Sequence, residues 1–135
     1  MRAAVLFLAL LAFPAGAWAV TEDLQPLKFE NVIDGATIIA SGRMVALWGV
    51  KPPEPSAAAS YTARQYLATM LGHGDLRCGD KFVSAGRRVM KCYIDDADVS
   101  SLIVQMGMGR AADPYYLGEE ATARAKHRGI WKPSN

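Results

Sequence analysis

The order of apolar and polar residues predicts a pair of strands early in the chain. Residues 32–40 are rich in β-branched side chains, which favours a strand, and Ser41-Gly42 supplies a turn. Residues 44–50 form the expected returning strand. Pairing about this turn places Thr37 opposite Ala46.

Further strands are predicted on either side of this pair. Residues 24–30 alternate in part, although Pro26 would confine such a strand to a sheet edge or a strand start. Residues 75–82 and 87–94 read as a second hairpin, which turns at residues 84–86.

Apolar spacing predicts three helices. The first covers residues 57–71 with Ser56 as N-cap, and its apolar face carries Ala63, Leu67, Met70 and Leu71. A short second helix begins after Asp98, and its apolar face carries Val99, Leu102, Ile103 and Met106. The third covers residues 118–128 and ends at Gly129.

The predicted order is β-β-β-α-β-β-α-α. Five short strands with a helix after the third suit a five-stranded Greek-key barrel of the oligonucleotide-binding (OB) type, accompanied by three α-helices. The chain has 135 residues, which allows one domain. Its formal charge of +2 is too small to indicate a nucleic-acid ligand by itself.

Residues 1–19 have the pattern of a secretory signal peptide. Arg2 gives a positive start, residues 3–13 are apolar, and Ala17-Trp18-Ala19 matches a cleavage site. The alternative is an uncleaved membrane anchor, which Pro14 and Gly16 disfavour. We therefore expect an exported protein, periplasmic or secreted and not stably anchored in the membrane, with a single domain at residues 20–135.

The two cysteines predict a disulfide. An even number of cysteines in an exported chain favours pairing. Cys78 and Cys92 lie symmetrically about the predicted turn, so they would face one another across the hairpin. The alternative is a pair of free buried thiols.

Several motifs, in order, resemble the staphylococcal nuclease (thermonuclease) family. Residues 32–37 resemble its Val-Ile-Asp-Gly-Asp-Thr, and residues 45–54 resemble its Ile-Arg-Leu-Trp-Gly-Ile-Asp-Ala-Pro-Glu. Residues 86–92 resemble the Gly-Arg-x-Val-Ala-x-Cys of exported members. Asp98-Val99-Ser100 and Gly129-Ile130-Trp131 also match, so the resemblance covers nearly the whole domain.

The resemblance implies an OB-type barrel and hydrolysis of DNA or RNA phosphodiesters. In that family two aspartates hold calcium, a glutamate activates water and two arginines bind the phosphate. Here the aspartate positions carry Ala36 and Lys51, and the first arginine position carries Ala46. Glu54 matches the glutamate and Arg87 the second arginine.

These substitutions predict loss or severe impairment of the family's reaction. Calcium prefers six to eight oxygen ligands, none of which the side chain of Ala36 supplies, and the positive charge of Lys51 repels the ion. We therefore expect neither calcium nor another cofactor. Two interpretations of the surviving pair remain open: Glu54 and Arg87 act on a phosphodiester without calcium, or Glu54 pairs with Lys51 or caps a helix while Arg87 is an ordinary turn residue.

The remaining candidates concern binding. Tyr115 and Tyr116 resemble the tyrosines at the family's nucleotide site, and they would either stack on a base or pack beneath the last helix. Lys51 and Arg87 belong to a basic group that forms either an anion-binding face or a solvated rim: Arg43, Lys51, Lys81, Arg87, Arg88 and Lys91. The sequence thus predicts a binding or interaction module, with nucleic acid or another polyanion as its partner. The alternative is a divergent calcium-independent nuclease.

Overall fold

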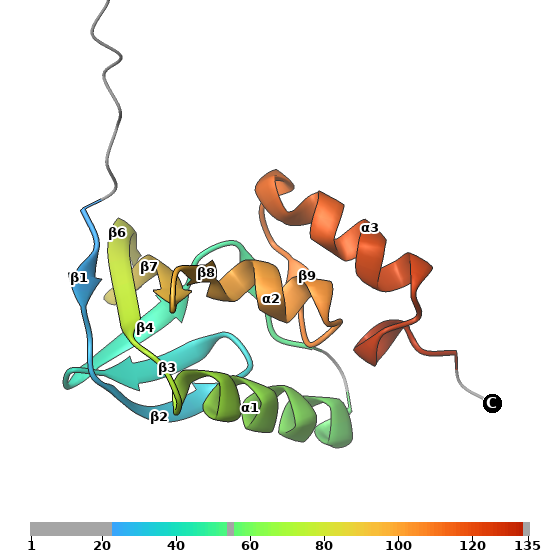
Figure 1. The fold of residues 1–135 in the computed structure, drawn as a ribbon, viewed down its shortest axis with the longest axis horizontal. Helices are drawn as coiled ribbons and strands as arrows, with labels where there is room; N and C mark the ends of the chain where they lie inside the picture. Colours follow the sequence, from blue (N-terminus) through green and yellow to red (C-terminus); the bar gives the residue numbers. More distant parts are fainter. Residues whose placement is uncertain (1–22, 54–55, 134–135) are drawn as a thin grey trace, which may run out of the picture.

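The protein folds into a mixed α+β domain in a computed structural model that describes residues 23–53 and 56–133. The segment predicted to be a signal peptide and the candidate residue Glu54 therefore lie outside the described residues. A multi-stranded sheet stands at one end of the molecule, α2 lies beside it and α3 lies beyond α2 (Figure 1).

The main sheet has seven strands in the order β1-β6-β7-β4-β3-β2, and β8 pairs with β7. Its strands are β1 Gln25–Pro26, β2 Phe29–Asp34, β3 Thr37–Ala40, β4 Arg43–Leu47, β6 Leu76–Ser84, β7 Arg87–Ile94 and β8 Ala97–Asp98. A second sheet pairs β5 Val50–Lys51 with β9 Arg110–Ala111. Within the main sheet, β4 and β7 run parallel.

The expected closed barrel is not confirmed. The strand path is open, because β1 and β2 stand at its two ends. Residues 24–30 were expected to form one strand, but β1 ends at Pro26 and β2 begins at Phe29. Pro26 has no N–H to donate, which limits pairing at this point. Between the two strands, Leu27 N–H still donates to the Leu76 carbonyl (2.9 Å), and the Lys28 carbonyl accepts from Ser41 N–H (2.8 Å).

The prediction of one strand over residues 32–40 is wrong. The chain reverses at Gly35-Ala36, which separates β2 from β3. Asp34 Oδ1 accepts a hydrogen bond from the Ala36 N–H (2.8 Å), and this local bond fixes the turn. The predicted register of Thr37 against Ala46 is confirmed in the pairing of β3 with β4.

Both predicted hairpin turns are two-residue turns with positive φ at each central residue. The values are 48° and 72° for Ser41-Gly42, and 50° and 73° for Ala85-Gly86. This geometry is that of a type I′ turn, whose twist matches the flanking strands. The second turn brings Cys78 opposite Cys92, and the predicted disulfide is confirmed.

The first predicted helix, α1, is confirmed with its bounds, Ala57–Leu71. Ser56 is the N-cap, and its Oγ accepts from the Ala59 N–H at 3.0 Å. The buried residues Ala63, Leu67 and Leu71 recur at helical spacing, as predicted, and α1 packs near β2.

The second helix, α2, covers Val99–Gln105 and is capped by Asp98 as predicted. Its apolar face differs in part from the prediction, because Met106 is exposed while Val104 is buried. The reason is that the helix stops at Gln105, so Met106 lies past the last turn that packs on the core.

The third helix, α3, covers Leu117–Ala125 and ends three residues earlier than predicted. It follows the 3-10 helix η1, Pro114–Tyr116, and precedes a second one, η2, Gly129–Trp131. His127 has a φ of +52°, and the Arg128 N–H donates to the Ala123 carbonyl at 3.0 Å. The stop is thus a Schellman motif with His127 in the position that glycine usually holds.

One apolar core joins the sheet to α1 and α2. Ile38, Val45 and Met90 contribute from the strands, and Leu67 and Ile103 from the helices. Among the described residues, Tyr116 has the largest side chain that is fully buried. Packing of these side chains holds β4 and β7 in place. The opposite side of these two strands carries the candidate site.

Candidate functional site

Alternate residues of β7 form a polar and aromatic row on the side of the sheet away from the core. Met90, Cys92 and Ile94 are buried, so the residues between them point the other way. That row consists of Arg87, Val89, Lys91 and Tyr93. Ala46 of β4 pairs with Val89 and therefore lies on this side as well.

The structure brings some of the sequence-predicted positions together and leaves others apart. Ala36 is buried next to β4, where its carbonyl accepts from the Leu47 N–H (2.8 Å). Arg87 is exposed at the start of β7, on the same side as Ala46. Lys51 lies in the other sheet, where it pairs with Arg110.

The residues at the positions that the resemblance assigns to calcium ligands do not fit a calcium ion. The side chain of Ala36 is a methyl group and that of Lys51 is an ammonium group, so neither offers an oxygen ligand. Within residues 23–53 and 56–133, no group of three or more His, Cys, Asp or Glu side chains is arranged to hold a metal. These side chains therefore cannot support the calcium-dependent mechanism of the family that the sequence resembles. The absence of a cofactor stays a prediction.

Three aromatic rings gather beside the β7 row. The ring centroid of Trp48 lies 5.6 Å from that of Tyr115 and 5.5 Å from that of Tyr116, and the two tyrosine rings are 4.9 Å apart. Tyr116 is buried, whereas Tyr115 is 61% exposed. Tyr116 therefore packs in the core, and Tyr115 leaves most of its ring open to solvent, while base stacking by these tyrosines stays a prediction.

Lys91 is a buried cation in the middle of this group, only 7% exposed. Its Nζ lies 3.4 Å from the Tyr115 hydroxyl, 3.8 Å from Asp98 Oδ2 and 4.4 Å from the Tyr115 ring centroid. Burial lowers the pKa of Lys91, but hydrogen bonds to Tyr93 and Tyr115 and the charge of Asp98 outweigh burial and raise the pKa above its ordinary value. The ammonium group is therefore charged at neutral pH.

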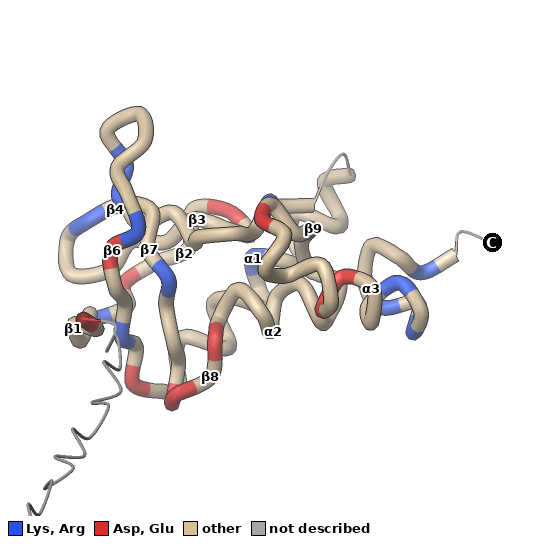
Figure 2. The backbone as a smooth tube through the Cα atoms, turned by 90° about the horizontal axis from the view of Figure 1, so that it is seen from above, with Lys and Arg blue, Asp and Glu red and all other residues tan. Residues whose placement is uncertain are grey.

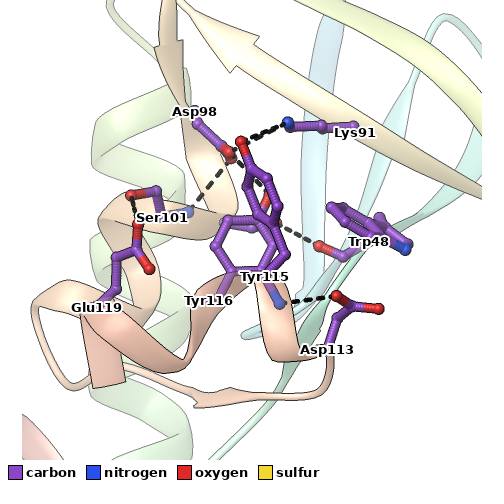
Figure 3. A network of polar contacts seen from close by, with 9 residues as sticks. Trp48, Lys91, Asp98, Ser101, Asp113, Tyr115, Tyr116 and Glu119 are labelled. Carbon is purple, nitrogen blue, oxygen red and sulfur yellow. Dashed lines mark hydrogen bonds and ion pairs between the residues drawn. The ribbon is translucent and has the colours of Figure 1, made fainter. Parts of the chain in front are cut away.

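Asp98 links this cation to the helices, as Figure 3 shows. One of its oxygens accepts from the Ser101 N–H at 3.3 Å, which caps α2, and the other accepts from the Tyr116 hydroxyl at 2.8 Å. Burial and this bond to Asp98 raise the pKa of Tyr116. Tyr115 is held separately, because its N–H donates to Asp113 Oδ1 at 2.9 Å.

A second lysine stands over the same tryptophan. Lys81 Nζ lies 4.5 Å from the ring centroid of Trp48. Lys81 and Lys91 also line an open concavity of about 180 Å³, together with Asp23, Gln25, Gly79 and Asp80. We call Trp48, Lys81, Lys91, Tyr115 and Tyr116 the aromatic–lysine cluster.

Sequence reasoning found only part of this cluster. Lys91 was placed in a basic group with an anion-binding face or a solvated rim as alternatives, and its burial excludes the solvated rim for this residue. Trp48 appears in the sequence analysis only within the matched motif at residues 45–54, without a predicted role. The sequence does carry one signal for this cluster. Arg87, Lys91 and Tyr93 fall on alternate positions of β7, which places two cations and a phenol on the side of the strand opposite Cys92.

A scan against protein-family models and a search of curated proteins both found no match to this chain. The disulfide is compatible with export from the cell. Among the helices of the described segments, none has the length and apolar character needed to cross a membrane.

Proposed function

We propose that this protein is an exported, metal-independent binding module for an anionic polymer, with single-stranded nucleic acid as the class that fits best. The observation that carries the proposal is the aromatic–lysine cluster: the Tyr115 ring is 61% exposed, and the exposed Lys81 stands 4.5 Å from the centroid of the neighbouring Trp48 ring. Base stacking on an aromatic ring and phosphate attraction to a lysine are the two components of sequence-tolerant binding to single strands.

The spacing of the cations favours a polymer over a single phosphate group. Arg87 and Lys91 are four residues apart on one side of β7, which corresponds to roughly 13 Å along a strand. The Lys91 ammonium is held at Asp98 and the Tyr115 hydroxyl, so it cannot swing toward a phosphate bound at Arg87, whereas an extended chain of phosphates can reach both positions. Asp98 neutralises part of the charge of Lys91, so exposed Lys81 and Arg87 would contribute most of the attraction.

We also propose that the fold is an OB-type barrel related to the staphylococcal nuclease family. Support comes from the continuity of β1 with β2 through Leu27 and Lys28, since these two strands are the ends of the sheet path. The parallel pairing of β4 with β7 supports it too, because it joins the first three-stranded unit to the second hairpin. Loss of hydrolysis follows from Ala36, Ala46 and Lys51, which remove the metal carboxylates and one arginine.

Binding is tested with a fluorescent oligothymidylate of about 12 nucleotides, a length within the range that one OB domain covers. We expect binding that weakens as salt rises, because phosphate contacts release counterions. Tyr115→Ala should weaken binding roughly tenfold, since one stacked base contributes about 1–3 kcal/mol. Tyr61→Ala is the matched control, because Tyr61 is equally exposed but lies on α1. Equal affinities of the two variants would refute the proposed surface.

Hydrolysis is tested by the release of acid-soluble nucleotides from DNA and RNA, with calcium and with chelator. We expect no release in either condition. Activity that needs calcium and disappears in Glu54→Gln would overturn the proposal. Activity that persists in chelator and disappears in Arg87→Ala would instead support the alternative, a divergent nuclease that uses Glu54 and Arg87.

A further inference from the structure

The end of the β6–β7 hairpin, Lys81–Arg88, is an exposed apolar tip with basic flanks. Phe82 is 52% exposed and Val83 is 69% exposed. Residues 81–87 are all exposed, and Figure 2 shows the hairpin projecting beyond the other strands. A side chain built on Gly86 would meet no atom within 4 Å, so the turn itself has open space around it.

The two apolar side chains of the tip point to opposite faces of the hairpin. Phe82 pairs with Val89 and Val83 pairs with Arg88, and neighbouring residues of a strand face opposite ways. A flat partner surface would cover one of these faces and leave the other in water. A medium that surrounds the tip covers both.

The charges of the tip identify the kind of medium. Lys81, Arg87 and Arg88 flank the apolar pair, and the sequence has no acidic residue from Lys81 to Ile94. Asp80 is the nearest acidic residue before this stretch, and it is paired with Arg88 at 2.9 Å. Apolar side chains that enter the headgroup boundary, flanked by cations that attract anionic lipids, are the pattern of interfacial membrane binding.

We propose that the hairpin tip Lys81–Arg88 inserts Phe82 and Val83 into the surface of an anionic lipid bilayer. Arg87 and Lys81 then contact lipid phosphates, and the type I′ turn lies within the headgroup layer. The two proposed sites share the cations Lys81 and Arg87, but this inference does not rest on the proposed function, because insertion depends on Phe82 and Val83 whereas base stacking depends on Tyr115.

The test is co-sedimentation with vesicles of phosphatidylcholine alone or mixed equally with phosphatidylglycerol. We expect binding to the mixed vesicles that weakens with salt, and weak binding to the neutral ones. The double variant Phe82→Ser with Val83→Ser should bind the mixed vesicles roughly tenfold more weakly, because two apolar side chains no longer leave water. Tyr61→Ser removes an exposed apolar ring elsewhere and should bind like the wild type.

All variants carry the same N-terminal segment, so a difference between them arises at the tip. A Val83→Trp variant gives a second measurement: its added fluorescence should be quenched by brominated lipid in mixed vesicles. Equal sedimentation of the double serine variant and the wild type, or an unquenched Trp at position 83, would overturn insertion. Absence of recruitment to either vesicle would do so too, even if the protein bound oligonucleotides.

Discussion

Gly49 is the position where one added methyl group should damage both stability and the candidate site. Its φ is +78°, a value that L side chains rarely adopt. A Cβ built on Gly49 would lie 2.4 Å from Cε2 and 2.6 Å from Cδ2 of Tyr116. Tyr116 cannot retreat easily, because its ring is buried and its hydroxyl donates to Asp98.

The expected cost of Gly49→Ala is the sum of two terms. Positive φ at a residue with a Cβ costs about 1 kcal/mol, and overpacking a tight core costs typically 1–3 kcal/mol. We therefore expect a decrease of about 2–4 kcal/mol in the free energy of unfolding, which is a large part of the ~5–15 kcal/mol of a typical domain. The displaced ring should also alter near-ultraviolet circular dichroism, since it contacts Trp48.

The assay is urea unfolding of the wild type and two variants. Gly42→Ala is the matched control, because Gly42 has nearly the same φ, +72°, and nothing within 4 Å of a built Cβ. It should lose only about 1 kcal/mol, from backbone strain. Equal destabilisation by the two substitutions would refute the reasoning, because the contact with Tyr116 would then contribute nothing.

Three further outcomes follow from the structure. Replacing Cys78 and Cys92 together by alanine should lower the free energy of unfolding by about 3 kcal/mol, measured in urea, because the bridge closes a short loop. His127→Gly should raise the free energy of unfolding by about 1 kcal/mol, since glycine adopts the positive φ of the Schellman position without strain. An unchanged midpoint of urea unfolding would contradict this. Stability should fall as pH rises through and above 10, because the native state keeps the Tyr116 hydroxyl protonated while an unfolded tyrosine ionises there. Tyr116→Phe should flatten that decline, and an equally steep decline in the variant would contradict the assignment.

Local signals made most of the secondary structure predictable from the sequence. The Ser56 cap and apolar spacing define α1 to the residue, and the symmetric placement of the two cysteines predicts the second hairpin and its disulfide. The turn at Gly35-Ala36 was missed, because the β-branched residues on both sides suggest one continuous strand. The Asp34-Gly35 pair is a turn signal, and here it outweighs the β-branched pattern of its neighbours.

The candidate site could be predicted only in fragments, because its geometry depends on distant parts of the chain. Trp48 follows β4, Lys91 lies in β7, Asp98 begins α2 and Tyr115 belongs to η1. No spacing rule places these residues together. Only packing of α2 and η1 beside the sheet brings the carboxylate of Asp98 and the ring of Tyr115 to the ammonium of Lys91.

The position of the disulfide has a consequence for the order of folding. Cys78 and Cys92 lie in one hairpin whose strands are consecutive, so the bridge can close as soon as that hairpin forms. The parallel pairing of β4 with β7 joins segments on either side of α1, and such non-local pairing is slower. The hairpin that carries both cysteines can therefore form before the sheet assembles, and oxidised chains should refold with docking of β4 on β7 as the slow step.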